Sequence, residues 1–350
     1  MQETALALAN GHFQTVFAKT SHGMVRGPSR FRLRGVIDPA CAGQDAGTAL
    51  DGRPRGIPIY PSIPDALAQV HPAPTHCVVG VATGGGVLPA DLYADLKAAA
   101  GAGMTLVNGL HHLLSTDPEL VRLTQENGGA ILDIRKPKPA SALRFWSGEV
   151  LRLQTPRVAV LGMDCAIGKR TTAMLLREAC RAHGLRAEMI YTGQTGWLQG
   201  LQHGFIFDAT LNDFVSGELE RAILDCRRET DPDLILLEGQ SALRNPSGPA
   251  GAEFILSGGA RGVILQHAPG RMYFEDLEAL GCTIPPIEEE IELIRLLGAR
   301  VWAVTLHTRG LTPEAAREAR GALADRLHLP VVLPLEDGVD ALVKVIQQHL

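Results

Sequence analysis

The sequence predicts an α/β protein made of two doubly wound domains, one over residues 1–145 and one over residues 150–350. The chain of 350 residues is longer than the ~250 to 300 residues that one hydrophobic core supports. Short apolar runs alternate with helix-like runs in both halves, which is typical of parallel sheets. Between the halves, residues 134–157 carry prolines at both ends, mixed charge and no sustained period, so they predict the domain boundary.

In the first half, the alternation begins near residue 30. The predicted strands are LRGVID, HCVVGVA, MTLVNG and AILDI, and the predicted helices are DALAQV, ADLYADLKAAAGA and DPELVRLTQENG. The glycines Gly84–Gly86 follow a strand and precede a helix that can begin near Pro89, which is where open α/β sheets keep ligand loops. They do not match G-x-G-x-x-G, so a ligand loop and a permissive turn both remain open.

In the second half, the same alternation resumes. The predicted strands lie near 158–161, 187–191, 234–238, 262–266, 301–306 and 330–333, and the predicted helices near 169–183, 213–228, 287–297, 313–327 and 338–349. This half therefore forms a second doubly wound sheet.

Composition narrows the class of protein. A net charge of -5 argues against bulk attraction to nucleic acid or to an anionic membrane. The six cysteines form no C-x-x-C pair, and neither an export signal nor a run of ~18 apolar residues is present. His111 and His112 have no carboxylate or cysteine at metal-ligand spacing, so no metal is expected. We therefore expect a soluble cytoplasmic protein with a small-molecule substrate.

The strongest motif is VAVLGMDCAIGKRTTAMLL, residues 158–176, which runs from an apolar strand into an amphipathic helix. It nearly matches the phosphate-binding pattern G-x-x-x-x-G-K-[ST], with Gly162, Gly168 and Lys169 as its glycines and lysine. Main-chain amides and the helix dipole of such a loop hold phosphate, and the lysine adds a charge. Arg170 stands where an ATPase has a magnesium-binding hydroxyl. The motif predicts phosphate binding with weakened metal chemistry, for a ligand with several phosphates.

Four further residues of the motif are candidates. Thr171 or Thr172 could replace the missing hydroxyl if the helix began one residue late. Asp164 could orient or deprotonate a substrate ammonium, or serve only as a loop or helix-cap residue. Cys165 could carry an acyl group, but a small loop residue is the favoured interpretation, because direct transfer needs no covalent intermediate.

Polar loops follow the neighbouring strands and should converge on the same sheet edge. Glu238 ends the apolar strand LILLE, where nucleotide-binding sheets place a functional carboxylate. The loop TGQTGWLQG contains Gln194, and Asp213 lies at a helix start where capping is an equal alternative. His267 ends another strand, with Arg271 beyond it, and is either a hydrogen-bonding residue or a base.

Several blocks together resemble a known family. GMDCAIGKRTTA, YTGQTGWLQG, FDATLNDFVSGELE, LLEGQSALRNPSGPAGAEFILS and GVILQHAPGR, with FAKTSHGMVR and VIDPACAG nearer the N-terminus, are similar to the signature blocks of the D-glutamate N-acetyltransferase (DgcN-like) family, formerly a domain of unknown function. The resemblance implies a Rossmann-like N-terminal domain, a C-terminal P-loop domain similar to dethiobiotin synthetase, a homodimer, and acetyl transfer from acetyl-CoA to the amine of D-glutamate. The missing hydroxyl beside Lys169 is shared by the family.

For that reaction, the ammonium must lose a proton and the oxyanion must be stabilised. The proton acceptor is then Glu238 or Asp164, the oxyanion donors lie around Gln194, and Arg244 with Arg271 binds the carboxylates.

Three alternatives remain open at this point. The segment around HCVVGVATGGG also resembles the CoA-binding domain of succinyl-CoA synthetase, and if CoA lies there the phosphate loop holds carboxylates instead. An ATP- and Mg²⁺-dependent ligase or kinase would use Lys169, Thr171 and Glu238. A nucleotide or CoA sensor would bind ligand without forming product.

Overall fold

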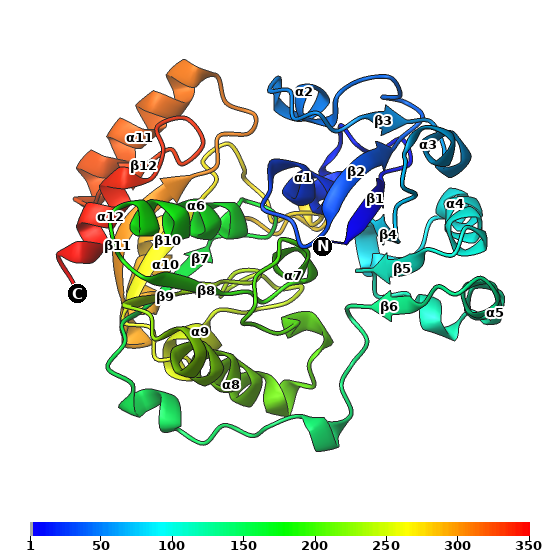
Figure 1. Ribbon diagram of the computed structural model, residues 1–350. Coiled ribbons are helices and arrows are strands. Elements are labelled where there is room, and N and C mark those ends of the chain that lie inside the picture. Colours follow the sequence, from blue (N-terminus) through cyan, green and yellow to red (C-terminus); the bar gives the residue numbers. More distant parts are fainter. Residues whose placement is uncertain (1–2) are drawn as a thin grey trace. The chain divides into compact units, whose positions relative to one another are not determined.

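The computed structural model describes residues 3–350, which fall into two compact units. Unit 1 contains the chain up to Pro137 together with Gly193–Gln202, and unit 2 contains Lys138–Thr192 and His203–Leu350. Figure 1 shows the helices and strands of both units. Each unit has a six-stranded sheet in which every pair of neighbouring strands is parallel. The predicted fold class of two doubly wound α/β domains is therefore confirmed.

The sheet of unit 1 has the strand order β3-β2-β1-β4-β5-β6. Its strands are β1 (Thr4–Leu8), β2 (Arg32–Ile37), β3 (Ile59–Tyr60), β4 (His76–Val79), β5 (Thr105–Asn108) and β6 (Ile131–Asp133). Its helices are α1 (Lys19–Arg26), α2 (Ala46–Asp51), α3 (Ile63–Gln69), α4 (Ala90–Gly101), α5 (Pro118–Glu126) and α7 (Gln194–Leu198).

The centre of this sheet is the strand that begins the chain. β1 pairs with β2 on one side and with β4 on the other, and Ala5–Leu8 are fully buried. From β1 the chain adds β2 and β3 on one side of the sheet, and it then returns to add β4, β5 and β6 on the other side. The strand order therefore reverses between β1 and β4. A ligand crevice forms at such a reversal, outside the carboxyl ends of the strands.

A short segment from the second half of the sequence packs into unit 1. Leu198 of α7 joins a buried cluster with Phe31 and Val78, and the guanidinium of Arg30 lies 4.2 Å from the ring centre of Trp197. Arg30 Nε also donates to the Trp197 carbonyl at 2.9 Å. These contacts explain why residues 193–202 belong to unit 1 although β8 and α8 of unit 2 flank them in sequence.

The sheet of unit 2 has the strand order β12-β11-β10-β7-β9-β8. Its strands are β7 (Arg157–Gly162), β8 (Ala187–Ile190), β9 (Leu234–Glu238), β10 (Gly262–His267), β11 (Arg300–Leu306) and β12 (Val331–Val332). Its helices are α6 (Lys169–Ala182), α8 (Asn212–Thr230), α9 (Ala252–Leu256), α10 (Ile287–Leu296), α11 (Pro313–Leu327) and α12 (Asp340–Gln347).

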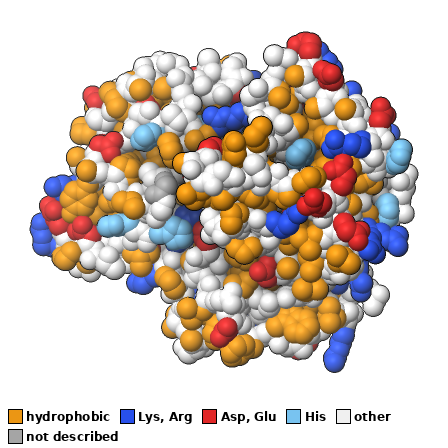
Figure 2. Space-filling view, turned by 180° about the vertical axis from the view of Figure 1, so that it is seen from behind, with side chains coloured by type: hydrophobic (Ala, Val, Ile, Leu, Met, Phe, Trp, Pro, Cys, Tyr) orange, Lys and Arg blue, Asp and Glu red, His pale blue; other side chains and the backbone are white. Residues whose placement is uncertain are grey.

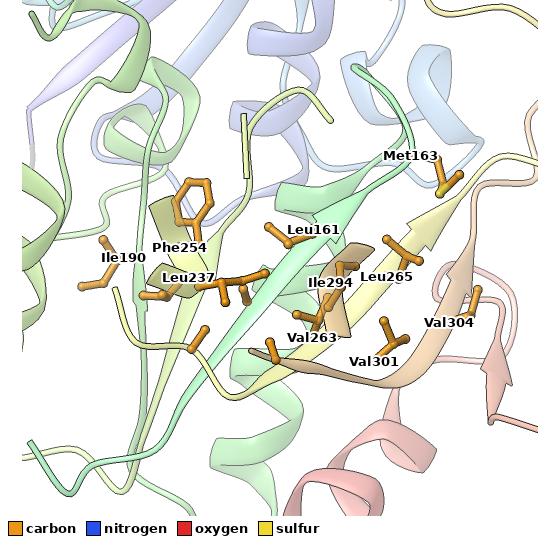
Figure 3. Close-up of a cluster of buried hydrophobic side chains, with 14 of the residues drawn as sticks. Leu161, Met163, Ile190, Leu237, Phe254, Val263, Leu265, Ile294, Val301 and Val304 are labelled. Carbon is orange, nitrogen blue, oxygen red and sulfur yellow. The ribbon is translucent and has the colours of Figure 1, made fainter. Parts of the chain in front are cut away.

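The core of unit 2 lies between the sheet and helices α8, α9 and α10. Alternate residues of the central strands, such as Leu161, Leu237 and Leu265, point into one cluster with Phe254 of α9 and Ile294 of α10 (Figure 3). The intervening strand residues point to the opposite face, because successive side chains of a strand alternate. Helix α6 packs on β7, β8 and β9 and against α12. The strand order reverses at β7, so the loop after β7 lies at the ligand-binding position of this sheet.

The surface shows no continuous field of one charge on the face in Figure 2, where basic and acidic side chains alternate over short distances. This agrees with the small net charge of -5. Within residues 3–350, none of the helices combines the length and the apolar character needed to cross a bilayer.

Candidate functional site: a phosphate loop with a buried lysine

The loop that follows β7 connects Gly162, the last strand residue, to Lys169, the first residue of α6. Five residues separate Gly162 from Gly168, one more than in the pattern. Gly168 has φ +94° and Ala166 has φ +53°, so the chain turns through left-handed conformations before the helix. A Cβ at Gly162 would lie 2.9 Å from Lys169 Cδ, which only glycine avoids. The end of the loop therefore brings main-chain amides to the N-terminus of α6, a helix of 14 residues.

Lys169 is held inside this loop. Its side chain is buried, and Nζ donates to the carbonyl oxygens of Asp164 and, at 2.6 Å, Ser241. Burial lowers the pKa of Lys169 to about 8, and electrostatic interactions with Cys165, Asp164 and Glu238 offset part of this decrease. The ammonium is thus placed by neutral carbonyl groups and remains available to attract an anion at neutral pH.

Asp164 joins three loops. Its carboxylate is fully buried and accepts hydrogen bonds from the amide of Cys165 at 2.6 Å, from Asn245 Nδ2 at 3.3 Å and from the amide of Glu275 at 2.8 Å. Arg271 Nη1 forms an ion pair with it at 2.6 Å. These contacts fit the loop-organising interpretation of Asp164, and its alternative role as a proton acceptor stays a prediction.

The hydroxyls near the lysine differ in their surroundings. Thr172 Oγ1 donates to Gln266 Oε1 at 2.6 Å, and Thr305 Oγ1 donates to the same oxygen at 2.7 Å. All three side chains are buried. The Thr172 hydroxyl is therefore used between α6, β10 and β11, which leaves Thr171 as the hydroxyl that could replace the one absent at Arg170.

Glu238 ends β9 next to this loop. Its Oε2 accepts from the Thr192 amide at 2.8 Å, its carbonyl accepts from Thr192 Oγ1 at 2.8 Å, and the side chain is 4% exposed. Burial raises the pKa of the Glu238 carboxyl, and the charges of Arg170 and Lys169 offset part of this effect. A buried carboxyl with a raised pKa at the carboxyl end of a strand, next to a phosphate loop, is suited to proton transfer.

Cys165 is half-buried in the phosphate loop. Its Sγ lies 3.4 Å from Ser241 Oγ and 3.8 Å from Asn245 Nδ2, and its carbonyl accepts from Arg271 at 2.9 Å. The thiol thus fills space between two loops, which agrees with the interpretation of a small loop residue, while an acyl-carrier role is untested.

The two predicted carboxylate-binding arginines are engaged within unit 2. Arg244 pairs with Glu289 at 2.6 Å and with Glu290 at 2.7 Å, at the start of α10. Arg271 pairs with Asp164 and, at 2.6 Å, with Glu275. Of the two, the structure brings Arg271 to the phosphate loop, and substrate binding by either arginine stays a prediction.

The remaining predicted residues lie at separate places. Gln194 begins α7 in unit 1, where a Cβ at Gly109 would lie 2.8 Å from its Cγ. Asp213 is exposed in the first turn of α8. Burial lowers the pKa of His267 to about 4, and among the described residues its buried Nδ1 has no hydrogen-bond partner. His267 is therefore neutral at pH 7.

Sequence reasoning missed the partners that hold the loop together. Ser241 and Asn245 follow β9, and Thr192 follows β8, so their polar loops were recognised but their bonds to Lys169, Asp164 and Glu238 were not. Ser241 has φ +34°, which is uncommon for a residue with a Cβ and is typical of functional or strained loops. Within residues 3–350, no three His, Cys, Asp or Glu side chains gather as a metal site.

Comparison with known proteins identifies the family. Residues 39–137 match the family model described as the DUF1611_N Rossmann-like domain, and residues 144–343 match the one described as the DUF1611_C P-loop domain, a domain of unknown function. A crystal structure of a DUF1611 family protein from Anabaena variabilis is 31% identical, with a TM-score of 0.89 over 99% of this chain and 100% of that chain.

Two curated relatives are named D-glutamate N-acetyltransferase. The one from a Pseudoalteromonas species is 32% identical, and the one from Tritonibacter scottomollicae is 28% identical. Each match covers 76% of this chain and 79% of the relative. The chain therefore belongs to the DUF1611 family, with a Rossmann-like N-terminal and a P-loop C-terminal domain, and resembles members named D-glutamate N-acetyltransferase.

Proposed function

We propose that the protein is an N-acyltransferase that moves the acetyl group of acetyl-CoA to the amine of D-glutamate. The proposal depends on one observation: a phosphate loop that lacks the magnesium-binding hydroxyl of an ATPase lies next to Glu238, a buried carboxyl with a raised pKa. The names of the two curated relatives support the same reaction.

CoA suits the phosphate loop because it carries a pyrophosphate and a 3'-phosphate and needs no magnesium chemistry. In this proposal the amides of residues 166–168 and the Lys169 ammonium bind its phosphates, because the amides of Met163 and Cys165 already donate within the protein, and Arg170 adds a second charge. Replacing the two carbonyl partners of Nζ by phosphate oxygens would give the buried ammonium a charged partner.

Glu238 is the proposed proton acceptor. An ammonium group is not a nucleophile, so one proton of D-glutamate must leave before attack, and a carboxyl whose pKa is raised by burial accepts a proton more readily than an exposed one. The Thr192 amide donates to one carboxylate oxygen and so fixes the orientation of the carboxyl group.

The transfer then needs no further reactant. The amine nitrogen bonds to the thioester carbonyl carbon, the tetrahedral oxyanion collapses, and the carbon–sulfur bond breaks. CoA leaves as a thiol after taking the second proton from nitrogen, and N-acetyl-D-glutamate is released. Arg244, Arg271 and His267 are proposed contacts for the substrate, and Asp213 is a further polar group of the same unit. The sequence-based assignment of Gln194, which belongs to unit 1, as an oxyanion donor stays a prediction.

The proposal is tested by following thiol release from acetyl-CoA with D-glutamate and, separately, with L-glutamate, first without and then with ATP and Mg²⁺. We expect release that depends on D-glutamate and is unchanged by ATP. ADP formation that requires Mg²⁺ would instead support a ligase or kinase. Tight CoA binding without product from either amino acid would support a sensor.

A further inference from the structure

Two arginines lie at the amino ends of neighbouring strands in the sheet of unit 2. Arg157 is the first residue of β7, and Arg261 directly precedes β10. The amide of Arg261 donates to the Arg157 carbonyl at 3.3 Å, which holds the two residues side by side. The phosphate loop begins after Gly162 at the opposite end of β7, roughly 17 Å away at the usual rise of a strand. The two arginines therefore belong to an edge of the sheet that the proposed transfer does not use.

Both arginine side chains point to the same face of the sheet. Ala159 of β7 and Val263 of β10 belong to the core cluster that the sheet forms with α8, α9 and α10. Each of these residues follows one of the arginines by two positions. Since successive side chains of a strand alternate between the two faces, Arg157 and Arg261 point to the face of this cluster as well.

Arg157 is a buried cation without an anionic partner in the protein. It is 8% exposed, and its Nη1 donates to the carbonyl oxygens of Leu153 at 3.2 Å and Thr155 at 2.7 Å. Within residues 3–350, no carboxylate forms an ion pair with Arg157 or with Arg261. Burial lowers the pKa of Arg157, and the positive charge of Arg261 lowers it further. Buried charges in proteins are normally paired, so this pair of cations lacks a counter-charge.

One edge of the Arg157 guanidinium makes no hydrogen bond. Nε is buried, and neither Nε nor Nη2 donates to any residue within 3–350. These two nitrogens lie side by side and present the parallel donors that bind a carboxylate or phosphate group. A Cβ at Gly259 would lie 2.9 Å from Nη2 and 3.3 Å from Nε. Because residue 259 is glycine, it has no side chain to cover this edge.

We propose that Arg157 and Arg261 bind an oxyanion, a phosphate or carboxylate group of a small solute, at the amino edge of the unit 2 sheet. Arg157 supplies the paired donors, and Arg261, which is exposed, supplies a second charge on the solvent side. The oxyanion provides the negative charge that the protein does not. Because Arg157 also holds the Leu153 and Thr155 carbonyls, the bound group stabilises the segment that leads into β7.

The test is calorimetric titration of inorganic phosphate into full-length Lys169→Ala protein, in which the phosphate loop is weakened, at about 0.15 M ionic strength. We expect one phosphate to bind. Arg261→Gln and Arg157→Gln, each added to this parent, should raise the phosphate Kd about 10-fold or more, the effect of losing one charge-assisted hydrogen bond. Arg300→Gln is the matched control and should leave the Kd unchanged. Arg300 begins β11 at the same edge, but the next residue, Val301, lies in the core cluster, so Arg300 points to the opposite face.

Thermal unfolding separates loss of the ligand contact from loss of the fold. Arg157→Gln also loses two carbonyl partners, whereas Arg261→Gln removes an exposed side chain and should unfold at the temperature of its parent. Phosphate should raise the Tm of the parent and raise that of Arg261→Gln much less. Arg157→Lys, which keeps the charge but not the paired donors, should bind phosphate with intermediate affinity.

Acetate, titrated in the same way, distinguishes the two oxyanion groups. Tighter binding of phosphate assigns the site to phosphate groups, and tighter binding of acetate assigns it to carboxylates. The inference is overturned if the Lys169→Ala parent binds neither anion, if folded Arg261→Gln binds as the parent does, or if Arg300→Gln weakens binding as much as Arg261→Gln. These titrations contain no acetyl-CoA, so their outcome is independent of the proposed transfer.

Discussion

Lys169 Nζ donates a hydrogen bond to the carbonyl oxygen of Ser241 at 2.6 Å, which joins the phosphate loop to the loop after β9. The lysine is therefore held by main-chain oxygens of two loops. In the proposed function, phosphate oxygens of CoA replace these neutral partners of the ammonium.

Replacing Lys169 by Ala should weaken CoA binding about 10- to 100-fold, because a charge-assisted hydrogen bond contributes roughly 1.5 to 3 kcal/mol. Calorimetric titration with CoA measures the change. Lys344→Ala is the control, since Lys344 is exposed on α12 of the same unit. Equal CoA affinity in a folded Lys169→Ala variant would refute the placement of CoA phosphates at this loop.

The affinity for CoA should fall as the pH rises above about 8. The pKa of Lys169 is lowered from 10.5 to about 8 in the ligand-free protein, so the group loses its positive charge as the pH passes through that value. Bound phosphate favours the charged form, so binding takes up a proton in this range. Titration from pH 7 to 9.5 measures the slope, and Lys169→Arg, which stays charged, should remove it; an equal slope in both proteins contradicts this role.

Glu238→Gln should lower kcat about 10²- to 10⁴-fold, the usual contribution of a general base, with little change in CoA affinity. Because burial raises the pKa of the Glu238 carboxyl above its ordinary value of 4.5, the wild-type rate should fall as the pH decreases through this raised pKa. The Glu238→Gln variant should not show this decrease. Steady-state rates against pH measure both effects. Glu318→Gln, on the exposed face of α11, should behave as wild type, and a Glu238→Gln variant with normal kcat would exclude the base.

Cys165→Ala should retain kcat within a few-fold of wild type. The thiol only approaches Ser241 and Asn245 at 3.4 and 3.8 Å, and direct transfer to an amine needs no acyl-enzyme. Intact-protein mass spectrometry after acetyl-CoA treatment should show no acetylated cysteine. A stable acetyl adduct that is absent from Cys165→Ala, with loss of activity, would establish a covalent route.

Asp164→Ala should lower the free energy of unfolding by about 3 kcal/mol, because it leaves Arg271 and several buried donors without their acceptor. Urea denaturation measures the loss. Asp325→Ala, on an exposed position of α11, should change stability by less than about 0.5 kcal/mol. If Asp164→Ala is as stable as wild type but inactive, Asp164 acts in proton transfer and not in organising the loops.

Helices with strong periodicity could be located from sequence to within a few residues. The predicted helix 313–327 matches α11 (Pro313–Leu327), and 169–183 matches α6 (Lys169–Ala182). Short or small-residue elements were not located: β1 (Thr4–Leu8), the central strand of unit 1, and α7 (Gln194–Leu198). The five residues TALAL carry weak β propensity, and only pairing with β2 and β4 makes them a strand.

For the site, the sequence identified the phosphate loop and the strand-end carboxylate, because glycine spacing and an apolar strand are local patterns. It could not show that Thr172 donates to Gln266, 94 residues away, or that Asp164 meets Arg271, 107 residues away. Such partners follow from which strand ends are neighbours.

The sequence by itself predicted two α/β domains, the turn from β7 into α6 and the exchange of a metal-binding hydroxyl for Arg170, since each follows from a local pattern of residues. Only the tertiary structure decided that Lys169 rests on the Ser241 carbonyl, that burial changes the pKa values of Lys169 and Glu238, and that Arg157 and Arg261 lie together without a carboxylate partner among residues 3–350. The physical reason is that desolvation and long-range hydrogen bonds depend on strand order, which no local pattern encodes.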